Sequence, residues 1–267
     1  MANSNQNRTE GEIDRLRHAL DAETRRCLEV RGQLDRVNAE FEQFVSMAAH
    51  NLRESLRDVA SFSQLLAETY AGRLDSDADV FFERIQGGTA RMQSLLADVV
   101  DYWTTCAGDR QTSPTEMEAV LRQALLCTER HIAECGAVVT HDALPPVCED
   151  FDILTKVVHH LIKNAIEYCD KPSPRVHISS KRVDLDWVFS VEDNGPGIDP
   201  TFQGRIFEVF KRLHGRSAYE GTGIGLALCR QIAEQHGGHI TATSAPGEGA
   251  TLKITLPLRQ TQKEGSP

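Results

Sequence analysis

The sequence lacks three features that would place it in other classes of protein. Its seven cysteines are odd in number and none stands in a C-x-x-C pair, so neither a zinc site nor a disulfide framework is predicted. No apolar stretch approaches the roughly 18 residues that a membrane-spanning helix needs. Positive charge is in deficit, with 29 Lys and Arg against 39 Asp and Glu, and a net charge of −10 disfavours nonspecific binding to nucleic acid or anionic lipid. We therefore expect a cytoplasmic protein with no membrane segment in this chain and no nucleic-acid partner.

What the sequence does contain is enough apolar material for two modules. The chain has 267 residues, of which 40% are hydrophobic and 25% are charged. That length and composition fit one or two hydrophobic cores.

The first segment has the heptad pattern of a coiled coil that begins near Gly11. A lone amphipathic helix packed on its own domain is the alternative, but charge crowds the remaining positions and no proline interrupts the pattern. The pattern favours a dimeric coil with its core at Ile13, Leu20, Cys27, Leu34, Phe41 and Ala48 (position a) and at Leu16, Glu23, Val30, Val37 and Phe44 (position d).

His50 follows this pattern at heptad position c, two residues after Ala48. The register that buries Ala48 therefore turns the imidazole toward solvent. A histidine on a helix is usually only a surface residue, but exposure is also what a phosphoryl acceptor requires.

The helix that carries His50 is predicted to continue to about Ala71, where Gly72 marks a turn. A second helix is expected from about Asp79 to Cys106. The two should close as an antiparallel hairpin, and two hairpins make a four-helix bundle. The apolar stripe of the second helix consists of Phe82, Ile85, Met92, Leu95, Leu96 and Val99.

The second half of the chain mixes helical and strand patterns without regular alternation, which argues against Rossmann and TIM-barrel topologies. The predicted fold class is α+β: a helical hairpin with an amino-terminal coiled coil, followed by an α/β sandwich. Helices are predicted at 116–135, 151–169 and 225–236, and strands at 137–140, 175–181, 186–192, 239–244 and 250–256.

A glycine-rich string from Gly221 to Leu228 is the sharpest motif in this half. Glycines let backbone amides approach phosphate oxygens, and a helix that begins within the string offers unpaired N–H groups and a positive dipole end to an anion. Several nucleotide-binding folds use such a string. Its candidate ligand-binding residues are Gly221, Thr222, Gly223, Gly225 and Leu226.

Around His50 the sequence reads His-Asn-Leu-Arg-Glu-Ser-Leu. This run resembles the H box of bacterial sensor histidine kinases. It is most similar to that of the subgroup related to bacteriophytochromes, which has a glutamate four residues after the histidine, as Glu54 is here. The resemblance implies that His50 accepts the phosphoryl group. Asn51 stands where the family usually has an acidic residue, and an amide cannot serve as a base. Glu54, on the same helical face, is the candidate to orient the ring and take its proton.

Four motifs in the second half resemble, in family order, the ATP-binding domain of these kinases. The resemblance implies that Asn164 helps to hold Mg²⁺ against the phosphates, that Tyr168 covers the adenine ring, and that Asp193 accepts a hydrogen bond from the adenine amine. Gly195 and Gly197 let the backbone turn beneath the base. Phosphate charge would be neutralised by a lid segment with Lys211, Arg212 and Arg216.

The resemblance as a whole implies a sensor histidine kinase core that binds ATP and Mg²⁺. The core would phosphorylate His50, pass the phosphoryl group to an aspartate of a response regulator receiver domain, and form a homodimer. His160 stands where hydrolytic relatives place a water-activating glutamate, which disfavours simple ATP hydrolysis. The expected division is 1–40 (tail and coiled coil), 41–110 (dimerisation and phosphotransfer), 111–260 (ATP binding) and 261–267 (flexible tail).

Two departures from the family pattern keep a second function open. Asn51 replaces the usual acidic residue, and Glu167 stands where a lysine near the phosphates is frequent. The alternative is a weak or inactive kinase that acts as a phosphatase or as a nucleotide-binding dimeric scaffold.

Overall fold

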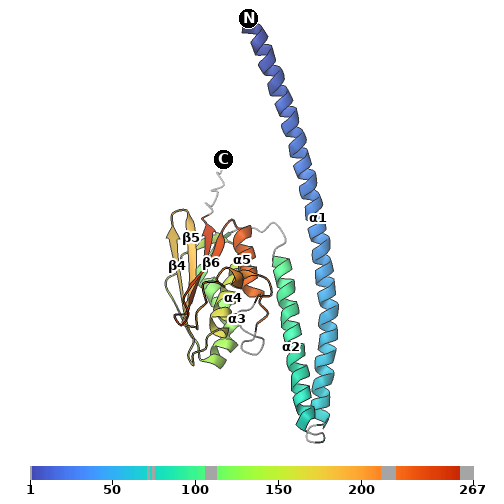
Figure 1. The fold of residues 1–267 in the computed structure, drawn as a ribbon, viewed down its shortest axis with the longest axis vertical. Helices are drawn as coiled ribbons and strands as arrows, with labels where there is room; N and C mark the ends of the chain where they lie inside the picture. The colour runs from blue at the N-terminus through green and yellow to red at the C-terminus, as the bar shows by residue number, and fades with distance from the viewer. Residues whose placement is uncertain (1, 71–72, 74–75, 106–112, 212–220, 259–267) are drawn as a thin grey trace. The chain divides into compact units, whose positions relative to one another are not determined.

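A computed structural model describes residues 2–70, 73, 76–105, 113–211 and 221–258 (Figure 1). The chain divides into two compact units, Met1–Asn51 and Leu52–Pro267, and each is described by itself. None of the described helices has the length and apolar content that a membrane span requires.

The first unit is the amino-terminal part of α1, a single helix that spans Ala2–Tyr70. The helix begins at Ala2, so the heptad pattern that starts near Gly11 lies within one continuous helix. The side chains of Ile13 and Leu16 lie outside the described residues. The remaining large apolar residues of the heptad pattern are exposed in the single chain: Leu20, Val30, Leu34, Val37, Phe41 and Phe44.

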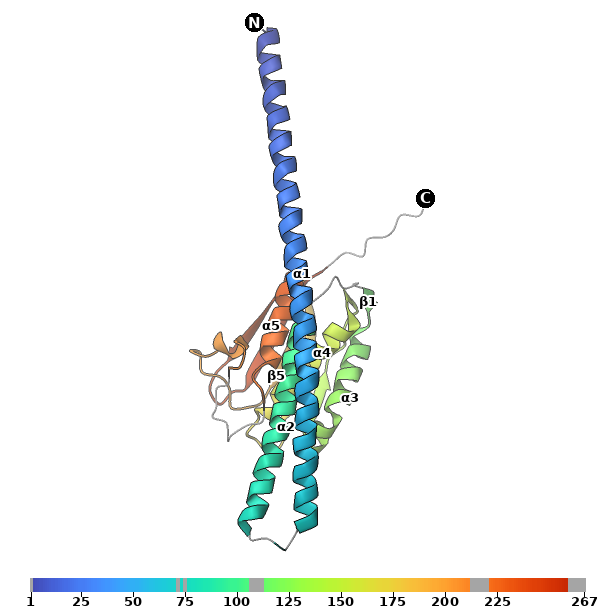
Figure 2. The ribbon, with the colours of Figure 1, turned by 90° about the vertical axis from the view of Figure 1, so that its right-hand side faces the viewer.

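The second unit opens with a helical hairpin, as predicted. Residues 52–70 of α1 run antiparallel to α2, which spans Ser76–Thr105 (Figures 1 and 2). Mostly small side chains form the less exposed face of α1, namely Leu56, Ala60, Ser63 and Ala67. On α2 the buried Thr89 follows the pair Gly87 and Gly88.

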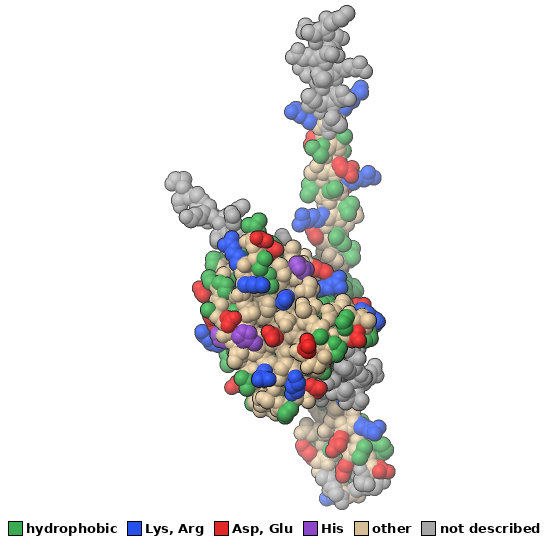
Figure 3. Space-filling model, turned by 60° about the vertical axis from the view of Figure 1, so that its left-hand side comes forward, with side chains coloured by type: hydrophobic (Ala, Val, Ile, Leu, Met, Phe, Trp, Pro, Cys, Tyr) green, Lys and Arg blue, Asp and Glu red, His purple; other side chains and the backbone are tan. Residues whose placement is uncertain are grey.

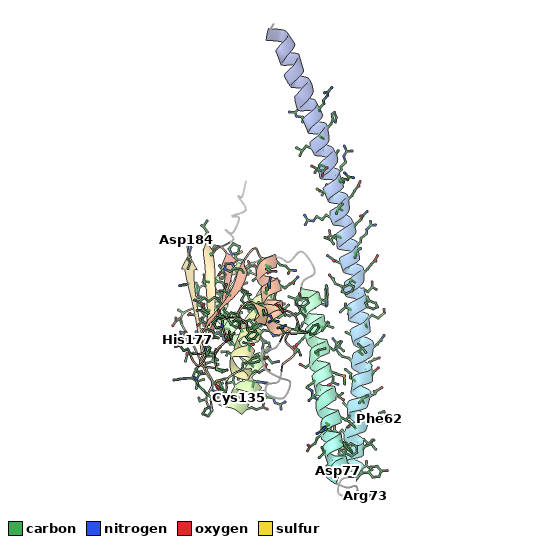
Figure 4. All side chains as sticks on the ribbon, in the orientation of Figure 1. Phe62, Arg73, Asp77, Cys135, His177 and Asp184 are labelled. Atoms are coloured by element: carbon green, nitrogen blue, oxygen red, sulfur yellow. The ribbon has the colours of Figure 1, made fainter. Side chains whose placement is uncertain are left out.

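The apolar stripe predicted for α2 is divided between two faces of that helix. Phe82, Leu96 and Val99 are partly buried, whereas Ile85, Met92 and Leu95 are exposed. Large apolar residues of α1 are also exposed, among them Phe62 near the end of the hairpin (Figure 4). The expectation that the whole stripe closes on α1 is therefore wrong for the single chain. One helix cannot cover an arc that wide, since a helix contacts its neighbour along a narrow stripe.

The carboxyl-terminal domain is built on a mixed five-stranded sheet in the order β2-β4-β5-β7-β6. β2 pairs in parallel with β4, and every other pair is antiparallel. The strands are β2 (Val138–His141), β4 (Arg175–Val183), β5 (Asp186–Asp193), β6 (His239–Ser244) and β7 (Ala250–Pro257). Asp184, with a φ of 53°, turns the chain between β4 and β5 (Figure 4).

Three helices cover one face of this sheet and enclose the core (Figures 1 and 2). They are α3 (Met117–Cys135), α4 (Phe151–Glu167) and α5 (Gly225–Gln235). Alternate residues of β7 point inward, with Leu252, Ile254 and Leu256 buried. The α/β sandwich predicted from the sequence is thus confirmed, and every predicted helix and strand of this domain is present.

Three short elements were not predicted. β1 (Ser113–Thr115) and β3 (Val147–Glu149) form a separate antiparallel pair, and η1 (Arg205–Phe207) is a single turn of 3₁₀-helix. On the face of the domain shown in Figure 3, side chains of both charges are interspersed.

Candidate functional site

A cleft between α4, the carboxyl end of β5 and the start of α5 collects most of the residues predicted to bind nucleotide. It has two compartments that share Asn164, Tyr168, Ile206, Lys211 and Leu226. Because five lining residues are common to both, the compartments form one continuous site. Their linings differ: the first is mainly apolar and the second is mainly polar.

The apolar compartment contains one carboxylate, that of Asp193. This residue ends β5, and its Oδ1 accepts hydrogen bonds from the backbone N–H of Gly195 at 2.8 Å and of Ala250 at 3.1 Å. Both bonds use Oδ1, so Oδ2 is the atom available to a ligand. Burial raises the pKa of the Asp193 carboxyl, and the two N–H donors oppose that rise.

The walls of this compartment are apolar side chains from distant parts of the sequence. A flat, uncharged ring would fit between such walls, with Asp193 as an acceptor at one edge. The wall residues are Pro196, Ile198, Ile206, Leu226 and Leu252.

Two glycines beside Asp193 lie where the backbone of neighbouring loops passes very close. A Cβ built on Gly197 would be 2.0 Å from the carbonyl oxygen of Ala245, and one on Gly249 would be 2.0 Å from that of Asp193. Both have positive φ, 77° and 83°. Only glycine satisfies both the space and the dihedral angle.

The polar compartment lies between α4 and the glycine-rich string. Asn164 borders it from α4, and Gly221, Thr222, Gly223 and Gly225 border it from the opposite side. Gly225 is the first residue of α5, so the N-terminus of that helix faces the compartment. Unpaired N–H groups and the positive end of a helix dipole favour an anion at this position.

His160 explains why a glycine must begin α5. A Cβ on Gly225 would lie 2.9 Å from Nδ1 of His160, so the imidazole packs directly against the glycine-rich string. Burial is the main cause that lowers the pKa of His160 to about 4. The ring is therefore neutral at physiological pH, and the position that a glutamate occupies in the hydrolytic relatives carries no charge.

Charged side chains border the polar compartment on both sides. Lys163 and Lys211 are its described cations, and Asp98 and Glu167 are its described carboxylates. Asp98 comes from α2 and accepts a hydrogen bond from the hydroxyl of Thr222. Burial raises the pKa of both Asp98 and Glu167.

The structure places the predicted site residues in three groups. Ten of them border the cleft: Asn164, Tyr168, Asp193, Gly197, Lys211, Gly221, Thr222, Gly223, Gly225 and Leu226. Gly195 supports the cleft through its hydrogen bond to Asp193. Arg212 and Arg216 lie outside the described residues.

His50, Asn51 and Glu54 lie on α1 and not on the cleft-bearing domain. His50 is exposed, as its heptad position predicts.

Several cleft residues were missed by the sequence prediction. Lys163 had a usable signal, because it directly precedes Asn164 and stands one helical turn before Glu167. Ile206 also had one, because it begins the run that contains Lys211 and resembles a motif of the family. Asp98 had none, since it reaches the cleft from α2.

Comparisons with known proteins agree with this geometry. Residues 149–260 match the family described as "Histidine kinase-, DNA gyrase B-, and HSP90-like ATPase". Over 231 residues the chain is 42% identical to "Cyanobacterial phytochrome A" of Nostoc sp. (strain PCC 7120 / SAG 25.82 / UTEX 2576), a match that covers 86% of this chain and 30% of that protein. The chain contains a sensor histidine kinase core.

Solved structures share the fold of this kinase core. "ShkA full-length in complex with AMPPNP" superposes with a TM-score of 0.63 at 23% identity, over 82% of this chain and 46% of that one. "Histidine kinase ThkA (TM1359) in complex with response regulator protein TrrA (TM1360)" gives a TM-score of 0.56 at 17% identity, over 86% and 66%. The kinase core spans about a third of the length of the first curated relatives it matches.

Proposed function

We propose that this chain phosphorylates its own His50 with ATP and then transfers the phosphoryl group to an aspartate of a response regulator. The observation that carries the proposal is the two-compartment cleft. It pairs an apolar pocket that ends in Asp193 with a polar pocket formed by the glycine-rich string, and the same chain presents an exposed histidine.

ATP occupies both compartments in this proposal. The adenine ring lies between the apolar walls and donates its exocyclic amine to Oδ2 of Asp193, with Tyr168 against the ring. The phosphates lie against Gly221, Thr222 and Gly223 and the N-terminus of α5. Lys211 borders both compartments, and its Nζ lies 3.7 Å from Oε2 of Glu208.

The polar compartment also suits Mg²⁺. The amide oxygen of Asn164 is a hard ligand, and Asp98 and Glu167 border the same space. No group of three or more metal-ligating side chains occurs among the described residues, so Asn164 would hold an ion whose other ligands are phosphate oxygens and water. Bound Mg²⁺ would neutralise the charge that develops on the phosphates.

At His50 the proposed reaction is an in-line displacement. Nε2 attacks the γ-phosphorus, the Nε2–P bond forms, the bond to the β,γ-bridging oxygen breaks, and ADP leaves. The imidazole must lose its Nδ1 proton, and Glu54, one helical turn away in α1, receives it. His160 stands where hydrolytic relatives place a water-activating glutamate, and with its pKa lowered to about 4 it is a weak base.

The exposed apolar side chains of the hairpin support a homodimer. Leu52, Val59 and Phe62 on α1 and Ile85, Met92 and Leu95 on α2 are exposed in the single chain. A second hairpin would cover them and complete a four-helix bundle, and the apolar heptad positions of α1 would pair as a coiled coil. The response regulator would dock on the bundle near His50. A regulator partner is supported by ThkA, a kinase of the same fold that forms a complex with the response regulator protein TrrA.

A weak or inactive kinase, acting as a phosphatase or a scaffold, remains the second candidate. The observation in its favour is Glu167, a carboxylate at the edge of the phosphate compartment.

Incubation with γ-labelled ATP and Mg²⁺ tests the proposal. Wild type should acquire label that is stable to base and labile to acid, and His50→Ala should acquire none. His18→Ala, which alters another exposed histidine of α1, should label as wild type does. Label on the His50→Ala chain would exclude His50 as the acceptor, and no label on a wild type that binds ATP would favour the scaffold.

Adenine recognition by Asp193 predicts a pH dependence of nucleoside binding. The carboxylate accepts the amine best when ionised, and its pKa is raised by burial. Affinity for adenosine, which has no phosphate to titrate, should therefore be full above this raised pKa and should fall as the pH drops through it. Asp193→Asn should weaken binding at pH 7.5 by about 10-fold or more, because a charge-assisted hydrogen bond contributes roughly 1.5–3 kcal/mol.

NMR titration with adenosine at a series of pH values that spans the titration of the Asp193 carboxyl checks this prediction. The Asp193→Asn chain should show a weak, pH-independent affinity. Asp186→Asn, at the opposite end of β5, should match wild type. Equal pH profiles for wild type and Asp193→Asn would exclude Asp193 as the acceptor.

A further inference from the structure

One face of α4 brings an additional cation to the phosphate compartment. His160, Lys163, Asn164 and Glu167 are spaced so that they lie on the same side of the helix, and all four border the polar compartment. Lys211 borders both compartments, but Lys163 borders only the polar one. Among the described residues, Lys163 is therefore the cation whose position is specific to the phosphate end.

Lys163 is held by a weak ion pair. Its Nζ lies 3.4 Å from Oε1 of Glu167, one turn along the helix, and 30% of its side chain is exposed. Lys–Glu pairs one turn apart on a helix contribute only a small stabilisation. Phosphate oxygens are stronger partners for an ammonium group, which can form several short charge-assisted hydrogen bonds with them.

Glu167 has a second partner that would remain if Lys163 turned away. Nε2 of His131, on α3, lies 3.5 Å from the same Oε1. Only 11% of the Glu167 side chain is exposed, and burial raises the pKa of its carboxyl. A buried carboxylate needs a partner, and His131 can supply one without occupying the cleft.

We propose that Lys163 is a nucleotide-binding residue that exchanges Glu167 for a phosphate oxygen of ATP, and that Glu167 weakens ATP binding by competing for this cation. The proposal rests on the proposed function, because it assumes that the phosphates occupy the polar compartment. In this proposal Glu167, which stands where the family frequently has a lysine, lowers the affinity of the cleft for ATP. The kinase retains a phosphate-binding cation on α4, one helical turn before that carboxylate.

The test compares ATP with adenosine, since only ATP reaches Lys163. Isothermal titration of Lys163→Met should show ATP affinity lowered by about 10- to 100-fold, the range expected for a lost charge-assisted hydrogen bond. Adenosine affinity should change by less than about twofold, because Asp193 and the apolar walls are untouched. Lys253→Met, on β7 and outside both compartments, should bind both ligands as wild type does.

Glu167→Gln gives an independent arm that does not depend on the folding of the lysine variant. This change keeps the shape and removes the competing charge, so ATP affinity should rise several-fold while adenosine affinity stays constant. In the Lys163→Met background, Glu167→Gln should raise ATP affinity by less than it does in wild type.

Two results would overturn the inference. One is an unchanged ATP affinity in a folded Lys163→Met chain, and the other is an equal loss of ATP and adenosine binding, which indicates a structural role. If Lys163→Met does not fold, a Glu167→Gln chain with unchanged or weaker ATP binding would overturn it alone. Failure of the proposed function looks different, because wild type itself would then bind no ATP or leave His50 unlabelled.

Discussion

Autophosphorylation of His50 should fall by about 10²- to 10⁴-fold in Glu54→Gln, the usual contribution of a positioned general base. His50 and Glu54 are four residues apart in the continuous helix α1, a spacing that places two side chains on the same face. Asn51, directly after the histidine, cannot accept a proton. Glutamine keeps the size of Glu54 and its capacity to hydrogen-bond, so the loss of rate isolates proton acceptance.

The measurement is the single-turnover rate of label transfer from γ-labelled ATP at saturating nucleotide. ATP affinity should not change, because Glu54 lines neither compartment of the cleft. Asp58→Asn, one further turn along α1 and exposed, should leave the rate unaltered.

A rescue variant separates base catalysis from support of the helix. In the Glu54→Gln chain, Asn51→Asp restores a carboxylate beside His50 and should recover much of the lost rate. An unaltered rate in Glu54→Gln alone would remove Glu54 from the mechanism and leave the ring proton to solvent.

The sequence predicted the elements of the fold closely because their signals are local. The helix predicted to end at Ala71 ends at Tyr70, and the strand predicted at 239–244 is β6 without change. Hydrophobic periodicity and punctuation by glycine and proline depend only on neighbouring residues. Such patterns can be interpreted without knowledge of the tertiary structure.

What the sequence could not predict depends on contacts between distant segments. The three-residue strands β1 and β3 are too short for a periodic pattern and exist because they pair with each other. The division of the α2 stripe between Leu96, which is partly buried, and Leu95, which is exposed, depends on which distant elements pack against α2, and α5 is one of them.

The same distinction applies to the cleft. Asn164, Asp193 and the glycine-rich string were predicted because each lies within a recognisable motif. Leu252 lies outside the recognised motifs, and it completes the apolar walls only after folding. Asp98 belongs to no motif of the carboxyl-terminal domain, because it reaches the cleft from α2 of the helical hairpin.

Gly249→Ala should destabilise the carboxyl-terminal domain by roughly 3 kcal/mol and reduce adenosine affinity by more than about 10-fold. The positive φ of 83° costs an alanine roughly 1–2 kcal/mol. The added Cβ would also lie 2.0 Å from the carbonyl oxygen of Asp193, and forced overpacking typically costs a further 1–3 kcal/mol. Relief requires the end of β5 to move, and that movement carries the Asp193 carboxylate away from the adenine.

Gly247→Ala is the matched control for this collision. Gly247 has nearly the same φ, 84°, but a Cβ there meets no atom within 4 Å. The free energy of unfolding of Gly247→Ala should therefore fall only by the cost of the positive φ, roughly 1–2 kcal/mol. Its adenosine affinity should stay within about twofold of wild type. Urea denaturation followed by circular dichroism gives the two stabilities, and NMR titration gives the affinities. If both variants bind adenosine equally, the close approach of Gly249 to Asp193 does not position the carboxylate, and the apolar walls alone must orient the base.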